Sequence, residues 1–146
     1  MAPSSRRTPA TQLAMEVRDA ITRLNRRLRR TRPLGETTVA QLSALLSLDA
    51  AGAMTPRELA ETERVQPPTM TRIVAKLEER GFVQRTPHPT DGRQVVLAPS
   101  QAGRDMLAEY RRARDEWLAR QLAALSPEER DTVQRAAEIF NRLAKD

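Results

Sequence analysis

The chain has 146 residues, of which 39% are hydrophobic and 3% aromatic, so it can bury an aliphatic core in one domain, with or without an appended assembly element. It contains no cysteine and one histidine, which excludes disulfides, thiol redox switches and thiolate zinc sites, and we expect neither a metal nor a cofactor. No run approaches about 18 apolar residues and no signal-peptide pattern opens the chain, so we expect a cytoplasmic protein with no membrane contact.

The net charge of +6 favours a polyanionic partner such as nucleic acid, since each neutralised phosphate releases counterions. The excess lies in residues 1–33, which hold nine arginines and two acidic residues, whereas residues 55–98 hold seven basic and six acidic residues. The N-terminal arginines either contact phosphates, or complement the end of their own helix and keep the protein soluble. Bulk charge therefore does not locate a DNA-binding segment.

Two helices are predicted before residue 55, after a polar, flexible arm at residues 1–10. The first begins at Thr11 and carries one apolar stripe. The second begins at Thr38, where Gln41 three residues later completes a capping-box pattern. The stripe of the first helix consists of Leu13, Val17, Ile21, Leu24 and Leu28.

A helix-turn-helix is predicted next, and the rest of the chain is organised around it. Thr55, Pro56 and Glu58 predict the N-cap, first helical position and capping box of a short helix. A second helix follows the break at residues 65–68 and ends at Gly81, where a left-handed residue is needed. Its expected inward residues are Met70, Ile73, Val74 and Leu77, and its outward polar residues are Thr69, Thr71, Arg72 and Lys76.

Two short strands are predicted beyond this helix, over residues 82–85 and 94–97, with Arg93 in the polar turn between them. Helix, turn, helix and hairpin form the winged helix-turn-helix plan. Its second helix fits the major groove of double-stranded DNA, and an arginine at the hairpin tip can reach the adjacent minor groove. Arg72, Lys76 and Arg93 could each be an ordinary solvated charge, but their spacing relative to one another favours a DNA-binding surface.

Two further helices are predicted after the hairpin. Ser100 caps a long one, and Ser126, followed by Pro127 and two glutamates, begins the last. Apolar stripes on the helices at both ends of the chain need a surface to cover them. A second copy of the chain supplies that surface, so we expect a symmetric homodimer on a pseudo-palindromic operator.

The predicted fold is mainly α with a small β-hairpin wing. Residues 36–99 form the winged helix-turn-helix DNA-binding domain, and residues 11–33 and 100–146 form a helical dimerisation region. An enzyme is not expected, because no Gly-rich phosphate loop is present and the lone His88 lies in a turn without a catalytic partner. The alternatives are a sequence-tolerant architectural DNA-binding protein, which would bind all duplexes alike, and a winged helix that binds proteins.

The chain resembles the MarR family of bacterial transcriptional regulators in its order of elements and in three motifs. These are LEERGFVQR at residues 77–85, Asp91 and Arg93 in the wing, and the hydroxyl of Ser100 followed by Gly103. The resemblance covers nearly the whole chain. It implies a homodimer that binds palindromic promoter DNA, usually as a repressor, and releases it when a small, often aromatic and anionic effector binds between the dimer helices and the winged helix.

The resemblance also implies roles for individual residues. Asp91 would hold the Arg93 side chain at the wing tip in place before DNA arrives, which lowers the ordering cost of binding. The residues that match the groove-reading helix are Pro68, Thr69, Thr71, Arg72 and Lys76. The apolar residues that could line the effector pocket, although core packing or a dimer contact is the simpler role for each, are Leu24, Leu28, Leu45, Tyr110 and Trp117.

Three features depart from the family's pattern. Pro99 stands where an aliphatic residue is common, so the hairpin is expected to end one residue pair early. The cysteine of oxidant-sensing members is absent. Pro67 and Pro68 both start the reading helix, where only the first is favoured by helix geometry.

Overall fold

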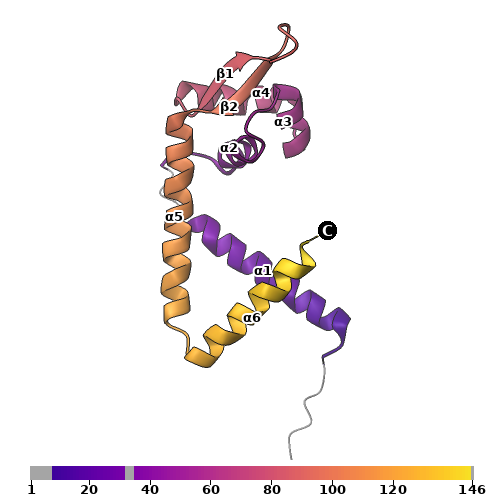
Figure 1. Ribbon diagram of the computed structural model, residues 1–146, viewed down its shortest axis with the longest axis vertical. Coiled ribbons are helices and arrows are strands. Elements are labelled where there is room, and N and C mark those ends of the chain that lie inside the picture. The colour runs from indigo at the N-terminus through magenta and orange to yellow at the C-terminus, as the bar shows by residue number, and fades with distance from the viewer. Residues whose placement is uncertain (1–7, 32–34, 146) are drawn as a thin grey trace, which may run out of the picture. The chain divides into compact units, whose positions relative to one another are not determined.

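The computed structural model describes residues 8–31 and 35–145, and the chain divides into two compact units. The winged unit is Pro33–Arg112, and the terminal unit is Met1–Arg32 with Ala113–Asp146. The structure is mainly helical with one antiparallel hairpin, which confirms the predicted fold class (Figure 1). The elements are α1 Ala10–Arg30, α2 Val39–Ala51, α3 Pro56–Glu63, α4 Pro67–Glu79, β1 Val83–Pro87, β2 Val95–Pro99, α5 Gln101–Ala123 and α6 Pro127–Leu143.

Capping boxes begin α2, α3 and α6, at the positions that the sequence indicates. In α3 the Thr55 hydroxyl accepts the N–H of Glu58 at 3.2 Å, and Glu58 Oε2 accepts the N–H of Thr55 at 2.7 Å. These reciprocal bonds satisfy two donors that have no partner within the helix. The starts of these helices are therefore fixed by pairs of residues three positions apart, which is why the sequence alone locates them.

The core of the winged unit is aliphatic and draws on its helices and on the hairpin. Met70, Val74 and Leu77 of α4 are at most 1% exposed, as their spacing predicts. Leu107 and Tyr110 of α5 join the same core, so the first part of α5 packs with the winged unit. The boundary between the units thus falls inside α5, whereas the predicted dimerisation region began at residue 100.

The end of α4 is set by Gly81, which has a φ of 74°. The Gly81 N–H donates to the carbonyl of Glu78 at 2.9 Å, and the Phe82 N–H donates to the carbonyl of Leu77 at 2.8 Å. This pair of bonds is the Schellman motif, in which a left-handed residue lets the chain turn back over the last carbonyls. The predicted stop at Gly81 is confirmed.

The wing extends further than predicted, and the expectation that Pro99 shortens it is wrong. Val83 pairs with Pro99, and Pro87 pairs with Val95. The Ser100 N–H donates to the Phe82 carbonyl at 2.9 Å, so the adjoining Val83–Pro99 pair is one whose own N–H groups point away from the partner strand. Proline lacks an N–H, but at such a position the ladder loses nothing.

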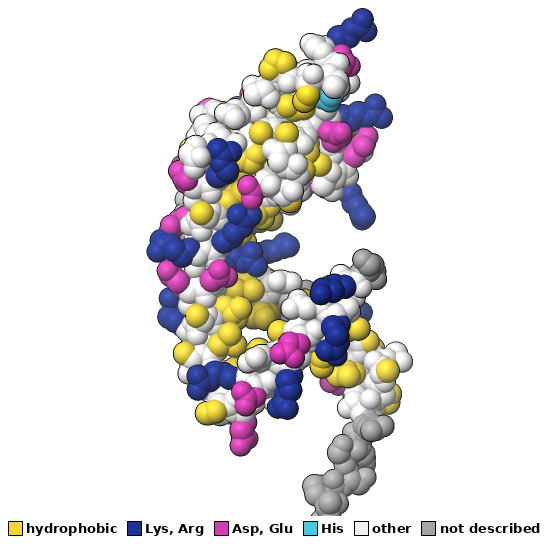
Figure 2. All heavy atoms as spheres, viewed as in Figure 1, with side chains coloured by type: hydrophobic (Ala, Val, Ile, Leu, Met, Phe, Trp, Pro, Cys, Tyr) yellow, Lys and Arg dark blue, Asp and Glu magenta, His cyan; other side chains and the backbone are white. Residues whose placement is uncertain are grey.

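The terminal unit leaves much of its apolar surface open. Leu28 is the single buried hydrophobic residue among its described residues, and hydrophobic side chains are visible on its helices (Figure 2). The Arg27 guanidinium lies 6.0 Å from the centre of the Trp117 ring, a cation–π contact within this unit. None of the helices in residues 8–31 and 35–145 is long and apolar enough to cross a membrane.

Candidate nucleic-acid interface

The polar face of α4 is open to solvent. Arg72 makes no side-chain hydrogen bond or ion pair with another described residue, so its five N–H donors are uncommitted. The inward and outward faces of α4 are thus as predicted, while the DNA contacts themselves stay a prediction. The exposed residues of this face are Pro68, Thr69, Thr71, Arg72 and Lys76.

The proline pair fits the start of α4. Pro67 and Pro68 occupy its first turn, and Gln66 is an N-cap without a side-chain hydrogen bond. First-turn N–H groups have no partner within a helix, so neither proline removes a bond there. Two missing donors do mean that this helix end offers little backbone N–H to a phosphate. The hydrogen-bond donors that α4 offers to solvent are therefore mainly on its side chains.

Lys76 forms an ion pair with Glu79, which lies one helical turn further along α4. Its ammonium donates to Glu79 Oε2 at 2.8 Å, and this hydrogen bond, followed by the charge of Glu79, raises the pKa of Lys76 and lowers the pKa of Glu79. The two side chains are 62% and 66% exposed, so solvent screens the pair and its contribution to stability is small. A contact of Lys76 with a DNA phosphate stays a prediction.

The wing turn is organised by Asp91, but not in the way expected. Asp91 Oδ1 accepts the backbone N–H of Arg93 at 3.1 Å, and Oδ2 accepts the side-chain amide of Gln94 at 3.1 Å. Within the described part of the chain, the Arg93 guanidinium has no ion pair with Asp91 or with any other residue. Asp91 therefore fixes the backbone that carries Arg93 and does not restrain the arginine side chain.

His88 contributes to the same turn, and sequence reasoning missed this role. Its ring Nδ1 accepts the backbone N–H of Thr90 at 3.2 Å and that of Asp91 at 3.1 Å. Its own backbone N–H donates to the Gln94 carbonyl at 3.1 Å, which closes the hairpin. The sequence did offer a signal for this role. A side-chain acceptor at His88 precedes the turn amides of Thr90 and Asp91 by two and three residues, as the acceptor of an Asx turn does.

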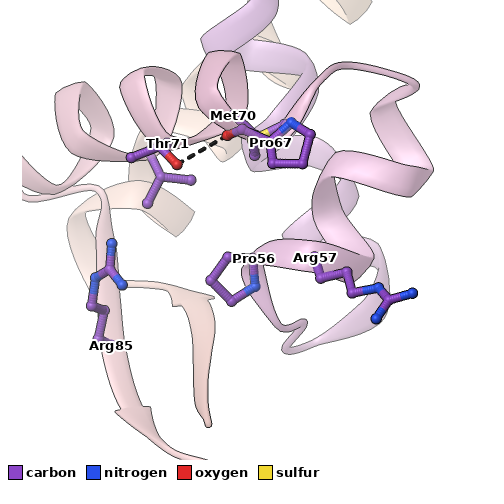
Figure 3. Close-up of a pocket in the computed structure, with 7 residues that line it drawn as sticks. Pro56, Arg57, Pro67, Met70, Thr71 and Arg85 are labelled. Carbon is purple, nitrogen blue, oxygen red and sulfur yellow. Dashed lines mark hydrogen bonds between the residues drawn. The ribbon is translucent and has the colours of Figure 1, made fainter.

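A cavity of about 410 Å³ lies within the winged unit, between the two helices of the helix-turn-helix and β1 (Figure 3). Arg85 of β1 reaches toward Thr71 of α4, and it also forms an ion pair of 2.5 Å with Glu78 near the end of α4. The Thr71 hydroxyl donates to the Pro67 carbonyl at 2.9 Å. The lining residues are Pro56, Arg57, Pro67, Met70, Thr71, Val74 and Arg85.

The five residues suggested for an effector pocket belong to both units. Leu45 and Tyr110 are buried in the core of the winged unit, at 0% and 3% exposed. Leu24, Leu28 and Trp117 belong to the terminal unit, where Leu24 is 45% exposed and Leu28 is buried. Core packing accounts fully for Leu45 and Tyr110, and an effector role for any of the five stays a prediction.

A helix-turn-helix with an exposed polar second helix, followed by a hairpin with a free arginine at its tip, defines a winged helix-turn-helix DNA-binding protein. Residues 37–95 match the model of the MarR family, and the chain belongs to that family. It is therefore a DNA-binding transcriptional regulator and not an enzyme.

Relatives of the chain agree with this assignment. The chain is 48% identical over 132 residues to the uncharacterized HTH-type transcriptional regulator Mb0904 of Mycobacterium bovis, a match that covers 90% of this chain and 92% of the relative. It is 32% identical over 108 residues to the HTH-type transcriptional repressor MdtR of Bacillus subtilis, covering 74% and 68% of the two chains. A mutant of S. aureus MepR bound to an oligodeoxyribonucleotide has a similar fold, with a TM-score of 0.69, 17% identity and coverage of 90% and 97%.

Proposed function

We propose that the protein is a homodimeric repressor that binds a pseudo-palindromic operator and releases it when a small aromatic anion binds. Two uncommitted guanidinium groups carry this function, Arg72 on α4 and Arg93 on the wing. They lie on the two elements that a winged helix places in neighbouring grooves of one DNA face. The repressor name of the relative MdtR supports the direction of regulation.

The distribution of exposed apolar side chains supports the homodimer. Ten large hydrophobic residues are exposed among the described residues, and eight of them lie on α1 or α6. A second copy of the chain offers the same two helices and would cover them by symmetry, with the two α4 helices about 34 Å apart along the DNA. The eight residues are Leu13, Met15, Ile21, Leu24, Val133, Ile139, Phe140 and Leu143.

Two places are candidates for the effector. One is the set of residues that the family resemblance suggests, among which Trp117 is the residue chosen for mutation. The other is the cavity of Figure 3, where Pro56, Pro67 and Met70 offer apolar walls and Arg85 a cation for a carboxylate. An occupant of this cavity would lie against the reading helix and would compete with Glu78 for Arg85.

A panel of phenolic acids would separate the two sites. We expect at least one acid to raise the thermal midpoint of the protein and to release operator DNA. Loss of this response in Arg85→Ala but not in Trp117→Ala would place the effector in the cavity of the winged unit, and the reverse would place it at Trp117. A broad panel without stabilisation or release would refute ligand control.

The DNA-binding function is tested by selecting genomic fragments with the purified protein. Mobility shift would then compare the enriched duplex with a scrambled one at about 150 mM salt. We expect one inverted repeat to be enriched and to be bound at least about 10³-fold more tightly than the scramble. Equal, steeply salt-dependent binding to both duplexes would instead support the architectural protein, and the absence of binding to either, with or without the phenolic acids, would support a protein-interaction module.

A further inference from the structure

His88 stands at the centre of the hydrogen bonds in the wing turn. Its Nδ1 accepts two backbone N–H groups, from Thr90 and Asp91, and the Thr90 hydroxyl lies 3.4 Å from the same nitrogen. In the next bonds of the turn, the backbone N–H of Arg93 and the side-chain amide of Gln94 donate to the Asp91 carboxylate. The ring of His88 is thus joined through Asp91 to the backbone of the wing-tip arginine.

The two amide donors determine the chemical state that this ring needs. A backbone N–H can only donate, so Nδ1 must present its lone pair and the ring proton must sit on Nε2. In the imidazolium form both ring nitrogens are donors, and Nδ1–H would then face two other N–H groups. Both hydrogen bonds would be lost and the turn would no longer be held from this side.

We propose that His88 is a positioning residue for DNA binding, whose neutral ring holds the turn that presents Arg93 and whose protonation loosens the wing. This role rests on the proposed DNA contact of Arg93. Histidine is the side chain that ordinarily changes charge between about pH 5 and pH 8, and His88 is the sole histidine of the chain. A dependence of operator affinity on pH in this interval would therefore report on the wing.

The charged groups around the ring come from the wing turn and from α3. Asp91 and Arg93 belong to the turn itself. Glu58, in the first turn of α3, interacts electrostatically with His88, although the pKa of Glu58 is lowered mainly by hydrogen bonds from Thr55 and only to a smaller extent by the histidine. The carboxylates of Asp91 and Glu58 are the negative charges near the ring, and the backbone N–H groups of Thr90 and Asp91 are the donors that Nδ1 accepts.

The test measures operator affinity of the tag-free, full-length protein at constant salt, at about pH 8 and about pH 5.5. Wild type should lose up to about tenfold in affinity at the lower pH, the largest loss that removing one proton from an ordinary histidine can cause at about one pH unit below its usual pKa. His88→Ala should bind with this loss already at pH 8 and show little further change. In His88→Asn the amide oxygen can accept the Thr90 N–H as an Asx turn, so binding should stay within about threefold of wild type at pH 8 and be insensitive to pH.

Glu58→Gln is the matched control, because glutamine keeps the capping box but removes the carboxylate near the ring. It should retain the pH response that His88→Asn abolishes. Amide NMR signals of Thr90 and Asp91 should move with pH in wild type and in Glu58→Gln, and stay fixed in His88→Asn. This readout follows the turn directly, without DNA.

Two results would overturn the role of His88: wild-type affinity for His88→Ala at pH 8, or the same pH dependence in wild type and His88→Asn. In both cases the wild-type protein still binds operator, so the proposed DNA-binding function survives. If wild type binds no duplex at either pH, the proposed function itself fails and the positioning role fails with it, whatever the amide signals of Thr90 show.

Discussion

Replacing Gly103 with alanine would press a methyl group against the backbone of Phe82. Gly103 is buried in the first turn of α5, and an ideal Cβ there would lie 2.2 Å from the Phe82 carbonyl oxygen and 3.1 Å from its carbon. Cβ atoms essentially never approach other atoms within 3.0 Å, so helix or hairpin would have to move by 3.0 − 2.2 = 0.8 Å. The opposing atoms belong to the backbone and cannot rotate away.

The expected destabilisation follows from three opposing terms. Overpacking of this kind costs about 1–3 kcal/mol, and displacing the Phe82 oxygen also weakens its hydrogen bond from the Ser100 N–H, worth about 0.5–1.5 kcal/mol. Alanine returns up to about 1 kcal/mol through its higher helix propensity. The clash dominates, so Gly103→Ala should lower the free energy of unfolding by about 1–3 kcal/mol.

Urea unfolding of the full-length protein, with the protein concentration held constant, would measure this change in the free energy of unfolding. Ala102→Gly is the matched control, since Ala102 is the exposed neighbour of Gly103 in the same turn of α5 and loses only helix propensity, about 0.5–1 kcal/mol. If helix propensity alone decided the outcome, the two substitutions would have opposite signs. We expect both to destabilise, and a Gly103→Ala protein more stable than wild type would refute the packing argument.

Four other substitutions test three separate parts of the molecule. Arg72→Ala should reduce the discrimination between the operator and duplexes with altered bases by about 1–3 kcal/mol, whereas Arg93→Ala should weaken binding to all duplexes. Competition mobility shifts would measure both effects. If both variants bound like wild type, the DNA-reading surface would be misassigned. Thr55→Ala should lower thermal stability by about 0.5–2 kcal/mol through loss of the N-cap of α3, more than Glu58→Gln does. Phe140→Glu, on an exposed apolar face of α6, should give monomers in sedimentation experiments, and an unchanged dimer would exclude this face from the interface.

Structural features that depend on residues close in the sequence could be predicted. Features that depend on which strand residues exchange hydrogen bonds could not. The capping boxes and the Gly81 stop involve residues within a few positions of one another, so a pattern of residue types specifies them. Pro99 was misjudged because its effect depends on which pairs of the hairpin exchange hydrogen bonds, and the sequence does not give that alternation.

The candidate site shows the same division. The exposed face of α4 followed from the helical period, because its apolar residues had to turn inward. The partners of Asp91 and His88 did not follow, since a carboxylate or an imidazole in a polar turn has several amides within reach and only the folded backbone selects among them. The packing of early α5 with the winged unit likewise depends on tertiary contacts of Leu107 and Tyr110.

The alternation of hydrogen-bonded and non-hydrogen-bonded pairs in the wing also affects aggregation at high protein concentration. Positions 83, 85 and 87 of β1, and 95, 97 and 99 of β2, direct their backbone groups outward, where a strand of another molecule could pair with them. Pro87 and Pro99 offer no N–H at these edges. The N–H and the carbonyl of Leu97 are already hydrogen-bonded to Met54, and Arg85 places a charge on the edge of β1. An exposed two-stranded ribbon is a template for edge-to-edge aggregation, and its two prolines protect this one without removing a single bond from the hairpin.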